Sequence, residues 1–217
     1  MGCAESRKHA CSDQERALQN SEQSLGFAKH SCFIVAFILR KYSYRGVINQ
    51  SQWEEIANML ELSTAKSSAG FDAFFKSFQA DKLYSAKTLT LAGILLSAGL
   101  PRQKAALIAE LYDEAMEGKL QEDTLLQIAA DLVELVVKRL PLLLGAPVAA
   151  QVESYCERLK APATVKVIVR ELLGSKNLDN MEAVPVHEFI AGSEQSELYT
   201  PAGVRSIVRR LTADVQV

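Results

Sequence analysis

The sequence is poor in the residues that mark several common classes of protein. Four cysteines among 217 residues are too few for a disulfide scaffold, and no pair of them has the spacing of a zinc site. The longest uncharged apolar runs, residues 32–39 and 89–100, are shorter than the roughly 20 residues that a membrane-spanning helix needs. The polar start of the chain lacks the apolar stretch of a secretory signal. We therefore expect reduced thiols and no transmembrane segment.

An excess of charge of one sign is also missing. The 24 basic and 26 acidic side chains leave a net charge of −2, which gives no electrostatic reason to expect a nucleic-acid partner. The sequence also lacks a phosphate-binding glycine loop, a nucleophile elbow and a zinc-protease motif. We therefore expect a protein that is not an enzyme and that binds no nucleic acid.

The residues that are abundant favour helices. Hydrophobic residues make up 48% of the chain, enough for a substantial core, while only 11 glycines and 6 prolines interrupt it. The one run that alternates in the manner of a strand, residues 164–169, also fits a helix. The sequence therefore predicts an all-α protein.

The first six residues, Met-Gly-Cys-Ala-Glu-Ser, match the signal for N-myristoylation at Gly2. The adjacent Cys3 is a candidate for palmitoylation, and two lipid signals give stable anchoring where one does not. Residues 1–22 lack apolar periodicity, so we expect a flexible acylated tether. This pattern predicts a peripheral protein on the cytoplasmic face of a membrane.

A degenerate repeat runs through the rest of the chain. Its frame is a 12-residue loop between two helices, with glycine at position six and an apolar residue at position eight. Gly46 and Ile48 fill these positions in the first loop, and Gly118 and Leu120 fill them in the third. The second and fourth loops keep only the apolar residue, as Leu83 and Val184. The four loops would span residues 41–52, 76–87, 113–124 and 177–188.

On these residues the chain resembles the EF-hand superfamily, in the two-lobed arrangement of calcineurin B and the neuronal calcium sensors. A narrower resemblance, on Gly118-Lys119-Leu120 and the apolar helix after it, is to the EF-hand-like region of myristoylated TLDc proteins. The resemblance implies four degenerate helix–loop–helix units, whose position-eight residues pair between neighbouring loops. The implied parts are a helix–loop–helix pair in 23–100, a second pair in 101–217, an insert at 140–161 and a terminal helix at 201–212.

The first two loops do not offer the oxygen ligands that calcium needs. Calcium requires carboxylates at several loop positions and a bidentate glutamate at position twelve. Lys41 and Arg45 stand at positions one and five of the first loop, and Lys76 and Lys87 stand at positions one and twelve of the second. Coulomb repulsion from these side chains disfavours a bound cation.

The last two loops keep some candidate ligands. Asp113 and Glu117 occupy positions one and five of the third loop, while Asp179 and Glu188 occupy positions three and twelve of the fourth. We expect weak calcium binding at most, and no other cofactor.

Two further segments each allow two interpretations. The leucine-rich stretch 141–147 either fills a groove between the lobes or meets a partner. The terminal helix has apolar residues on one face and Arg205, Arg209 and Arg210 on the other, so it could pack internally or lie on lipid.

The leading hypothesis is a membrane-anchored, largely calcium-independent adaptor that binds an amphipathic helix of a partner protein. The alternatives are a calcium sensor with residual sites in the second lobe and a structural subunit of a larger, for example cytoskeletal, assembly.

Overall fold

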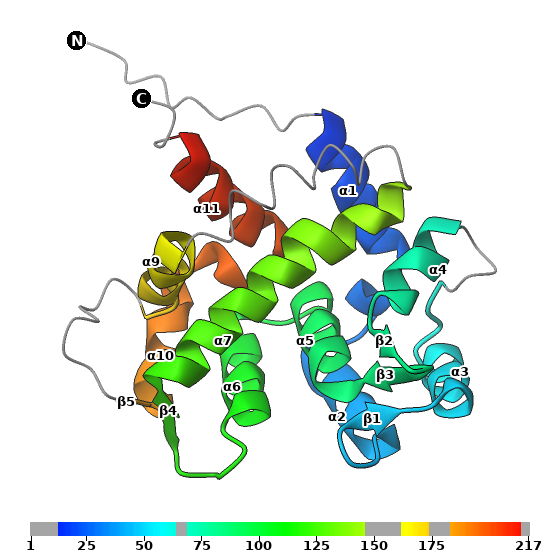
Figure 1. Ribbon diagram of the computed structural model, residues 1–217, viewed down its shortest axis with the longest axis horizontal. Helices are drawn as coiled ribbons and strands as arrows, with labels where there is room; N and C mark the ends of the chain where they lie inside the picture. Colours follow the sequence, from blue (N-terminus) through cyan, green and yellow to red (C-terminus); the bar gives the residue numbers. More distant parts are fainter. Residues whose placement is uncertain (1–12, 64–68, 146–161, 174–182, 214–217) are drawn as a thin grey trace.

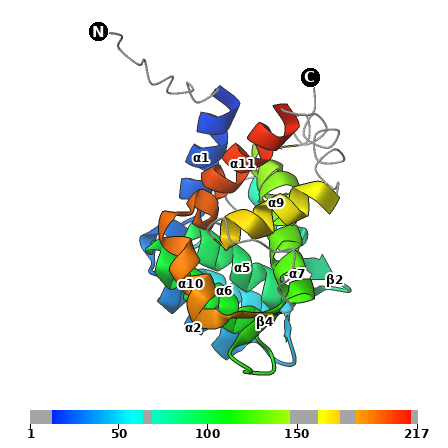
Figure 2. The same cartoon turned by 90° about the vertical axis from the view of Figure 1, so that its left-hand side faces the viewer.

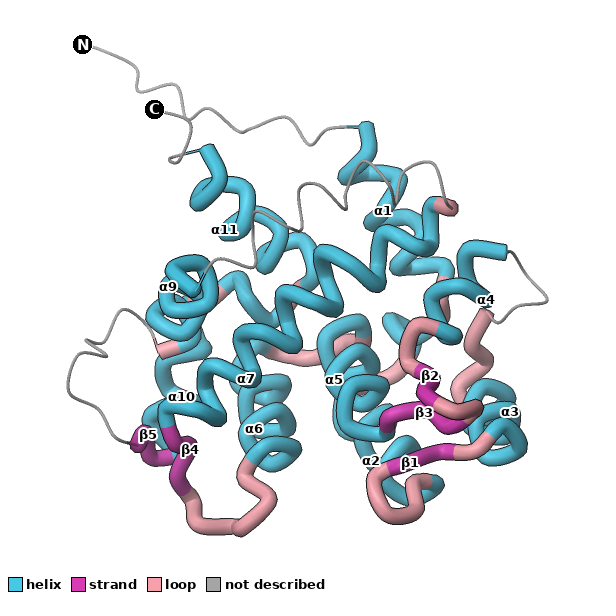
Figure 3. Tube along the Cα trace, viewed as in Figure 1, coloured by secondary structure: helices cyan, strands magenta, loops and turns pink. Residues whose placement is uncertain are grey.

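The computed structural model describes residues 13–63, 69–145, 162–173 and 183–213, and it is mostly helical (Figure 1). Gly2, Cys3 and Asp179 lie outside the described residues. The described strands are short and lie between helices, where Figure 3 draws them in magenta. The predicted helical character of the chain is therefore confirmed.

The N-terminal half contains two helix–loop–helix units that meet through their loops. Strand β1 of the first unit pairs antiparallel with β3 of the second, with Ile48 opposite Tyr84. Helices α2 and α5 pack closely and bury their facing sides. The elements are α2 (Cys32–Tyr42), β1 (Val47–Ile48), α3 (Gln50–Met59), α4 (Ala69–Lys76), β2 (Gln79–Ala80), β3 (Leu83–Ser85) and α5 (Ala86–Leu96).

The C-terminal half repeats this arrangement. Strand β4 pairs antiparallel with β5, and Leu120 lies opposite Val184. Buried apolar residues from both halves form one continuous cluster among the described residues. The elements are α6 (Pro101–Tyr112), β4 (Lys119–Gln121), α7 (Glu122–Val133), α9 (Pro162–Leu172), β5 (Ala183–Pro185), α10 (Val186–Gly192) and the 3₁₀ turns η4 (Ser193–Gln195) and η5 (Glu197–Tyr199).

Helix α7 carries the chain from one half to the other (Figure 1). It continues through the π-helical segment η2 (Glu134–Arg139) into the 3₁₀ helix η3 (Leu140–Leu144), which contacts α4. A Cβ atom on Gly70 of α4 would lie 2.4 Å from the carbonyl oxygen of Leu143, so this contact requires glycine. The described start of the leucine-rich insert therefore packs within the chain.

The sequence prediction of a flexible tether over residues 1–22 is wrong from Asp13 onward. Helix α1 (Asp13–Ser24) packs against η3 and is followed by the 3₁₀ turn η1 (Phe27–Lys29). Its inward side carries Glu15, Leu18 and Glu22, all less than 10% exposed. Two of these three side chains are acidic, so a search for apolar periodicity alone does not reveal the helix.

The carboxylates of α1 are buried because Arg205 is buried with them. Arg205 lies on α11 (Pro201–Ala213), and its guanidinium donates hydrogen bonds of 2.7 and 2.9 Å to Glu15 and of 2.5 Å to Glu22. Burial tends to raise the pKa of both acids, but Arg205 and Arg209 together lower the pKa of Glu15, whereas burial prevails at Glu22. The expectation that Arg205 lies on a polar outer face is therefore wrong.

Replacing Arg205 by methionine removes the buried cation that Glu15 and Glu22 share. We expect Arg205→Met to lower the free energy of unfolding by about 3–5 kcal/mol, measured by urea denaturation. The matched variant Arg210→Met, at an exposed position of the same helix, should change it by less than about 0.5 kcal/mol. Equal effects of the two variants would show that the buried cluster does not hold α1 and α11 together.

Candidate partner-binding cleft and loop sites

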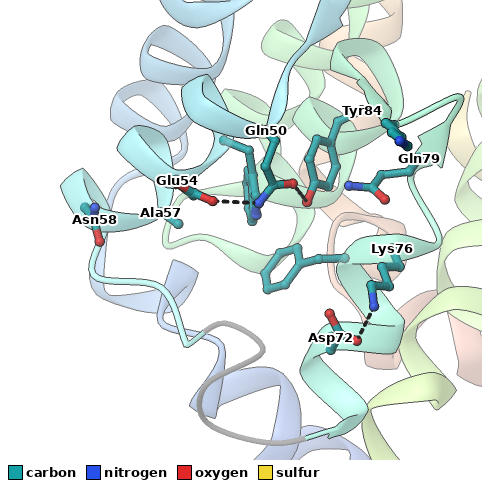
Figure 4. A pocket seen from close by; sticks show the side chains of 11 residues that line it. Gln50, Glu54, Ala57, Asn58, Asp72, Lys76, Gln79 and Tyr84 are labelled. Atoms are coloured by element: carbon teal, nitrogen blue, oxygen red, sulfur yellow. Dashed lines mark hydrogen bonds and ion pairs between the residues drawn. The ribbon is translucent and has the colours of Figure 1, made fainter.

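A cleft of about 530 Å³ opens between α3, α4 and the β2–β3 hairpin (Figure 4). It is larger than a second described cavity, of about 250 Å³, that lies beside Lys104. Side chains from both helix–loop–helix units of the N-terminal half line it, so its shape depends on how these units pair. The lining residues are Gln50, Trp53, Glu54, Ala57, Asn58, Asp72, Phe75, Lys76, Gln79, Lys82 and Tyr84.

Three aromatic side chains form the inner wall of the cleft. The ring of Trp53 lies 4.6 Å from that of Phe75 and 5.2 Å from that of Tyr84, both in tilted arrangements. Each of the three residues is less than 5% exposed. Such tilted contacts fix ring orientations, so this wall is a firm apolar surface.

A capping box sets the position of Trp53. Asn49 accepts a hydrogen bond of 2.9 Å from the backbone N–H of Gln52, whose side chain accepts one of 2.8 Å from the N–H of Asn49. This reciprocal pair caps the start of α3 at Gln50, three residues before Trp53, and so fixes the first turn of the helix, which lines the cleft. Gln52 would be position twelve of a calcium loop, and here it has a capping role instead.

The rim of the cleft is polar and carries both signs of charge. Gln50 accepts a hydrogen bond of 3.2 Å from the Tyr84 hydroxyl and donates one of 2.9 Å to Glu54. On the facing helix, Lys76 forms an ion pair of 2.8 Å with Asp72 (Figure 4). Burial raises the pKa of Tyr84, so its hydroxyl stays protonated at neutral pH. An apolar wall inside a mixed-charge rim suits the side chains of a peptide.

The structure corrects the predicted role of Leu83. Tyr84, rather than Leu83, lies opposite Ile48, and Leu83 pairs with Ala80 inside the β2–β3 hairpin. Asp81 and Lys82, both with positive φ, form the two-residue turn of this hairpin. The hairpin places the buried residue one position later than the 12-residue frame predicts. Since strand side chains alternate, Tyr84 faces the core and Leu83 is 39% exposed.

In the third loop, Asp113 binds the backbone of its own loop. Its carboxylate accepts hydrogen bonds of 3.0 Å from the N–H of Glu117 and of 2.8 Å from the N–H of Gly118. Gly118 has a φ of +69°, as Gly46 has +79° in the first loop, which supports the turns assigned to both glycines. Glu117 is exposed. Asp113 therefore stabilises the loop through two hydrogen bonds to its backbone.

Three of the four candidate metal ligands, Asp113, Glu117 and Glu188, lie within the described residues, where they do not form a metal-binding cluster. Glu188 lies in α10 and is half-buried. Over the described ranges, no three side chains of His, Cys, Asp or Glu gather closely enough to hold a metal ion. The same ranges contain no helix of the length and apolarity that crossing a bilayer requires.

A scan against protein-family models, a search of curated proteins and a search of solved structures all returned no match for this chain.

Sequence reasoning missed the cleft because its wall is assembled from three separate elements. Trp53 is the single tryptophan of the chain, and Asn49 followed by Gln52 marks the start of its helix. These two signals locate Trp53 on a helix. They do not show that Phe75 and Tyr84 converge on it, because that depends on the pairing of β1 with β3.

A second cavity, of about 250 Å³, is bordered by α1, α5, α6 and the start of α11 and contains Lys104. Lys104 is 4% exposed, and its ammonium donates hydrogen bonds of 2.8 Å to the carbonyl of Leu95 and 3.1 Å to that of Tyr199. Burial lowers its pKa to about 8, although interaction with Cys32 opposes the shift. Lys104 thus links the C-terminal end of α5 to η5.

The lowered pKa of Lys104 predicts a dependence of stability on pH. The unfolded chain keeps the proton up to about pH 10.5, whereas the folded chain releases it near pH 8, so this group's contribution to stability rises with pH between these values. We expect the slope of unfolding free energy against pH in wild type to exceed that of Lys104→Met by up to about 1.4 kcal/mol per pH unit. Chemical denaturation at pH 7.5–9.5 measures it, with exposed Lys119→Met as a control that keeps the wild-type slope. Identical slopes in wild type and Lys104→Met would contradict this role.

The geometry of Asp113 predicts a stability effect that is independent of calcium. Asp113→Ala removes two backbone hydrogen bonds, so we expect it to lower the free energy of unfolding by about 1 kcal/mol, equally in EDTA and in millimolar calcium. Asp113→Asn, which keeps one acceptor oxygen, should lose less. Micromolar calcium binding by wild type that Asp113→Ala abolishes, measured by calorimetry, would instead identify a functional site.

Proposed function

We propose that this chain is a non-catalytic EF-hand-like adaptor that binds a helix of a partner protein largely without calcium. The support for EF-hand-like units is the repeated arrangement of two helix–loop–helix segments joined by an antiparallel contact between their loops. This contact occurs once in each half, at Ile48 with Tyr84 and at Leu120 with Val184.

Hydrogen bonds and caps within the loops support the proposed calcium independence. The first loop begins its second helix with the capping box of Asn49 and Gln52. The third loop is held by Asp113 and its two backbone donors. Backbone hydrogen bonds and caps thus provide the local order that a bound ion provides in a calcium-binding loop. A residual calcium sensor stays the alternative, and the Asp113 experiment separates the two.

The cleft between α3 and α4 is the proposed site for the partner, and this is the observation that carries the proposal. Trp53, Phe75 and Tyr84 offer an apolar wall to an anchoring side chain. The mixed charges of Glu54, Asp72 and Lys76 around it would favour polar residues on either side of that anchor. An amphipathic helix presents this combination. The insert is not assigned an outside partner, because η3 is packed against α4.

The proposed location is the cytoplasmic face of a membrane, to which acyl groups on Gly2 and Cys3 would attach the chain. The sequence signal at the N-terminus supports this part of the proposal. Helix α1 would follow the acylated segment directly and join it to the core through Arg205.

The cleft is tested by a substitution that narrows it. Asn58 is exposed on its rim, so Asn58→Phe should weaken partner binding by at least about tenfold without unfolding the chain. Asn20→Phe, at an exposed position of α1, is the matched control and should bind as wild type does.

Binding is measured by capture from cell lysate in EDTA, followed by titration with peptides from the captured proteins. Trp53, the only tryptophan, reports occupation of the cleft through its fluorescence. Equal capture by wild type and Asn58→Phe, or capture that requires calcium, would contradict the proposed adaptor.

A further inference from the structure

Helix α2 lies in the longest part of the chain that lacks acidic residues. Residues 23–53 contain no aspartate or glutamate, although the whole chain has slightly more acids than bases. The basic residues of this stretch are Lys29, Arg40, Lys41 and Arg45. Its local charge is therefore opposite in sign to the net charge of the protein.

The outer side of α2 exposes large apolar side chains. Phe33 is 48% exposed, Ile34 is 50% exposed and Phe37 is 66% exposed. The opposite side of the helix, which includes Val35 and Leu39, is fully buried. Exposed apolar residues that occur singly are ordinary, but three within five positions of one helix form a continuous apolar surface. In Figure 2 the helix lies at the lower edge of the molecule.

Basic side chains continue this surface along the helix. Arg40 and Lys41 follow Phe37 by three and four positions, so all three lie on the same side of α2. Arg40 forms an exposed ion pair of 2.6 Å with Glu110 of α6. Lys41 lies 5.6 Å from the ring of its neighbour Tyr42, a contact that leaves its charge unneutralised.

The loop after α2 extends the same pattern. Tyr44 is 64% exposed, and the Arg45 guanidinium lies 5.3 Å from its ring. Acidic side chains from other parts of the chain contact this region. Glu110 pairs with Arg40, Glu61 lies 4.0 Å from Lys29, and Glu55 accepts a hydrogen bond from the Tyr42 hydroxyl. The exposed face of α2 therefore has an apolar part followed by a basic part.

We propose that this face, defined by Phe33, Ile34, Phe37, Lys41 and Arg45, is a contact surface for an anionic phospholipid bilayer. Aromatic and aliphatic side chains enter the boundary between headgroups and acyl chains, and basic side chains bind the lipid phosphates. The absence of acids over residues 23–53 favours this occupant, since an acid would be repelled by the anionic surface.

This inference rests on the membrane location in the proposed function. It adds a lipid contact that does not require the acyl groups. A further contact beside the acyl groups would strengthen attachment and fix the orientation of the protein on the membrane. It is separate from the α3–α4 cleft, because none of its residues lines the cleft.

The test uses the full chain produced without acylation and sedimented with vesicles of phosphatidylcholine alone or with 30% phosphatidylserine. Wild type should bind the vesicles that contain phosphatidylserine, and less so as salt rises. Phe33→Ser with Phe37→Ser should weaken binding about tenfold or more. Lys41→Glu should weaken it about fivefold or more. Met116→Ser, at a methionine 91% exposed, and Lys119→Glu, at an exposed lysine, are matched controls that should bind as wild type does.

Three outcomes would overturn the lipid surface. The first is no binding of unacylated wild type to either vesicle, and the second is binding that the α2 variants do not weaken. The third is a concentration-dependent dimer, seen by sedimentation velocity, that only the Phe33→Ser, Phe37→Ser variant loses while vesicle binding is absent. Capture of a partner by the cleft is measured without vesicles. A negative vesicle result therefore counts against the lipid surface and not against the adaptor proposal.

Discussion

The structure depends on two short antiparallel contacts between loops. A single helix–loop–helix unit cannot bury the apolar sides of both its helices, so each unit needs a neighbour. The contacts of β1 with β3 and of β4 with β5 join the units in pairs, and each places a buried residue, Ile48 or Leu120, opposite its partner. Because β3 also carries Tyr84 to the cleft, the first contact both holds the N-terminal half together and shapes the candidate binding site.

The two pairs are then held in one body by elements outside the repeat. Helix α7 extends through η2 and η3 onto α4, where Leu143 meets Gly70 without room for a side chain. At the other side, Arg205 of α11 binds Glu15 and Glu22 of α1, residues nearly two hundred positions away in sequence. Breaking such a buried ion pair is costly, so its burial commits both ends of the described chain to one arrangement.

Helix content, the glycine turns at Gly46 and Gly118 and the start of the terminal helix could be predicted, because they depend on local patterns. Thr200, for example, accepts a hydrogen bond of 3.1 Å from the N–H of Gly203, as expected of an N-cap. The second loop could not be placed, since its hairpin turn at Asp81 has no glycine to mark it. Helix α1 was missed because its inward side is largely charged, and its charges are compensated by Arg205 from the far end of the chain. The cleft, likewise, exists only after β1 and β3 have paired.

If the adaptor acts without calcium, the paired loops must keep their structure without a cation. Amide hydrogen exchange measures this directly at the N–H of Ala86, which donates to Gly46 of the first loop, and at the N–H of Ser85, which donates to Phe78 beside the β2–β3 hairpin. We expect strong and equal protection of these amides in EDTA and in millimolar calcium. Rapid exchange in EDTA that calcium suppresses would contradict it, because the pairing would then depend on a bound ion.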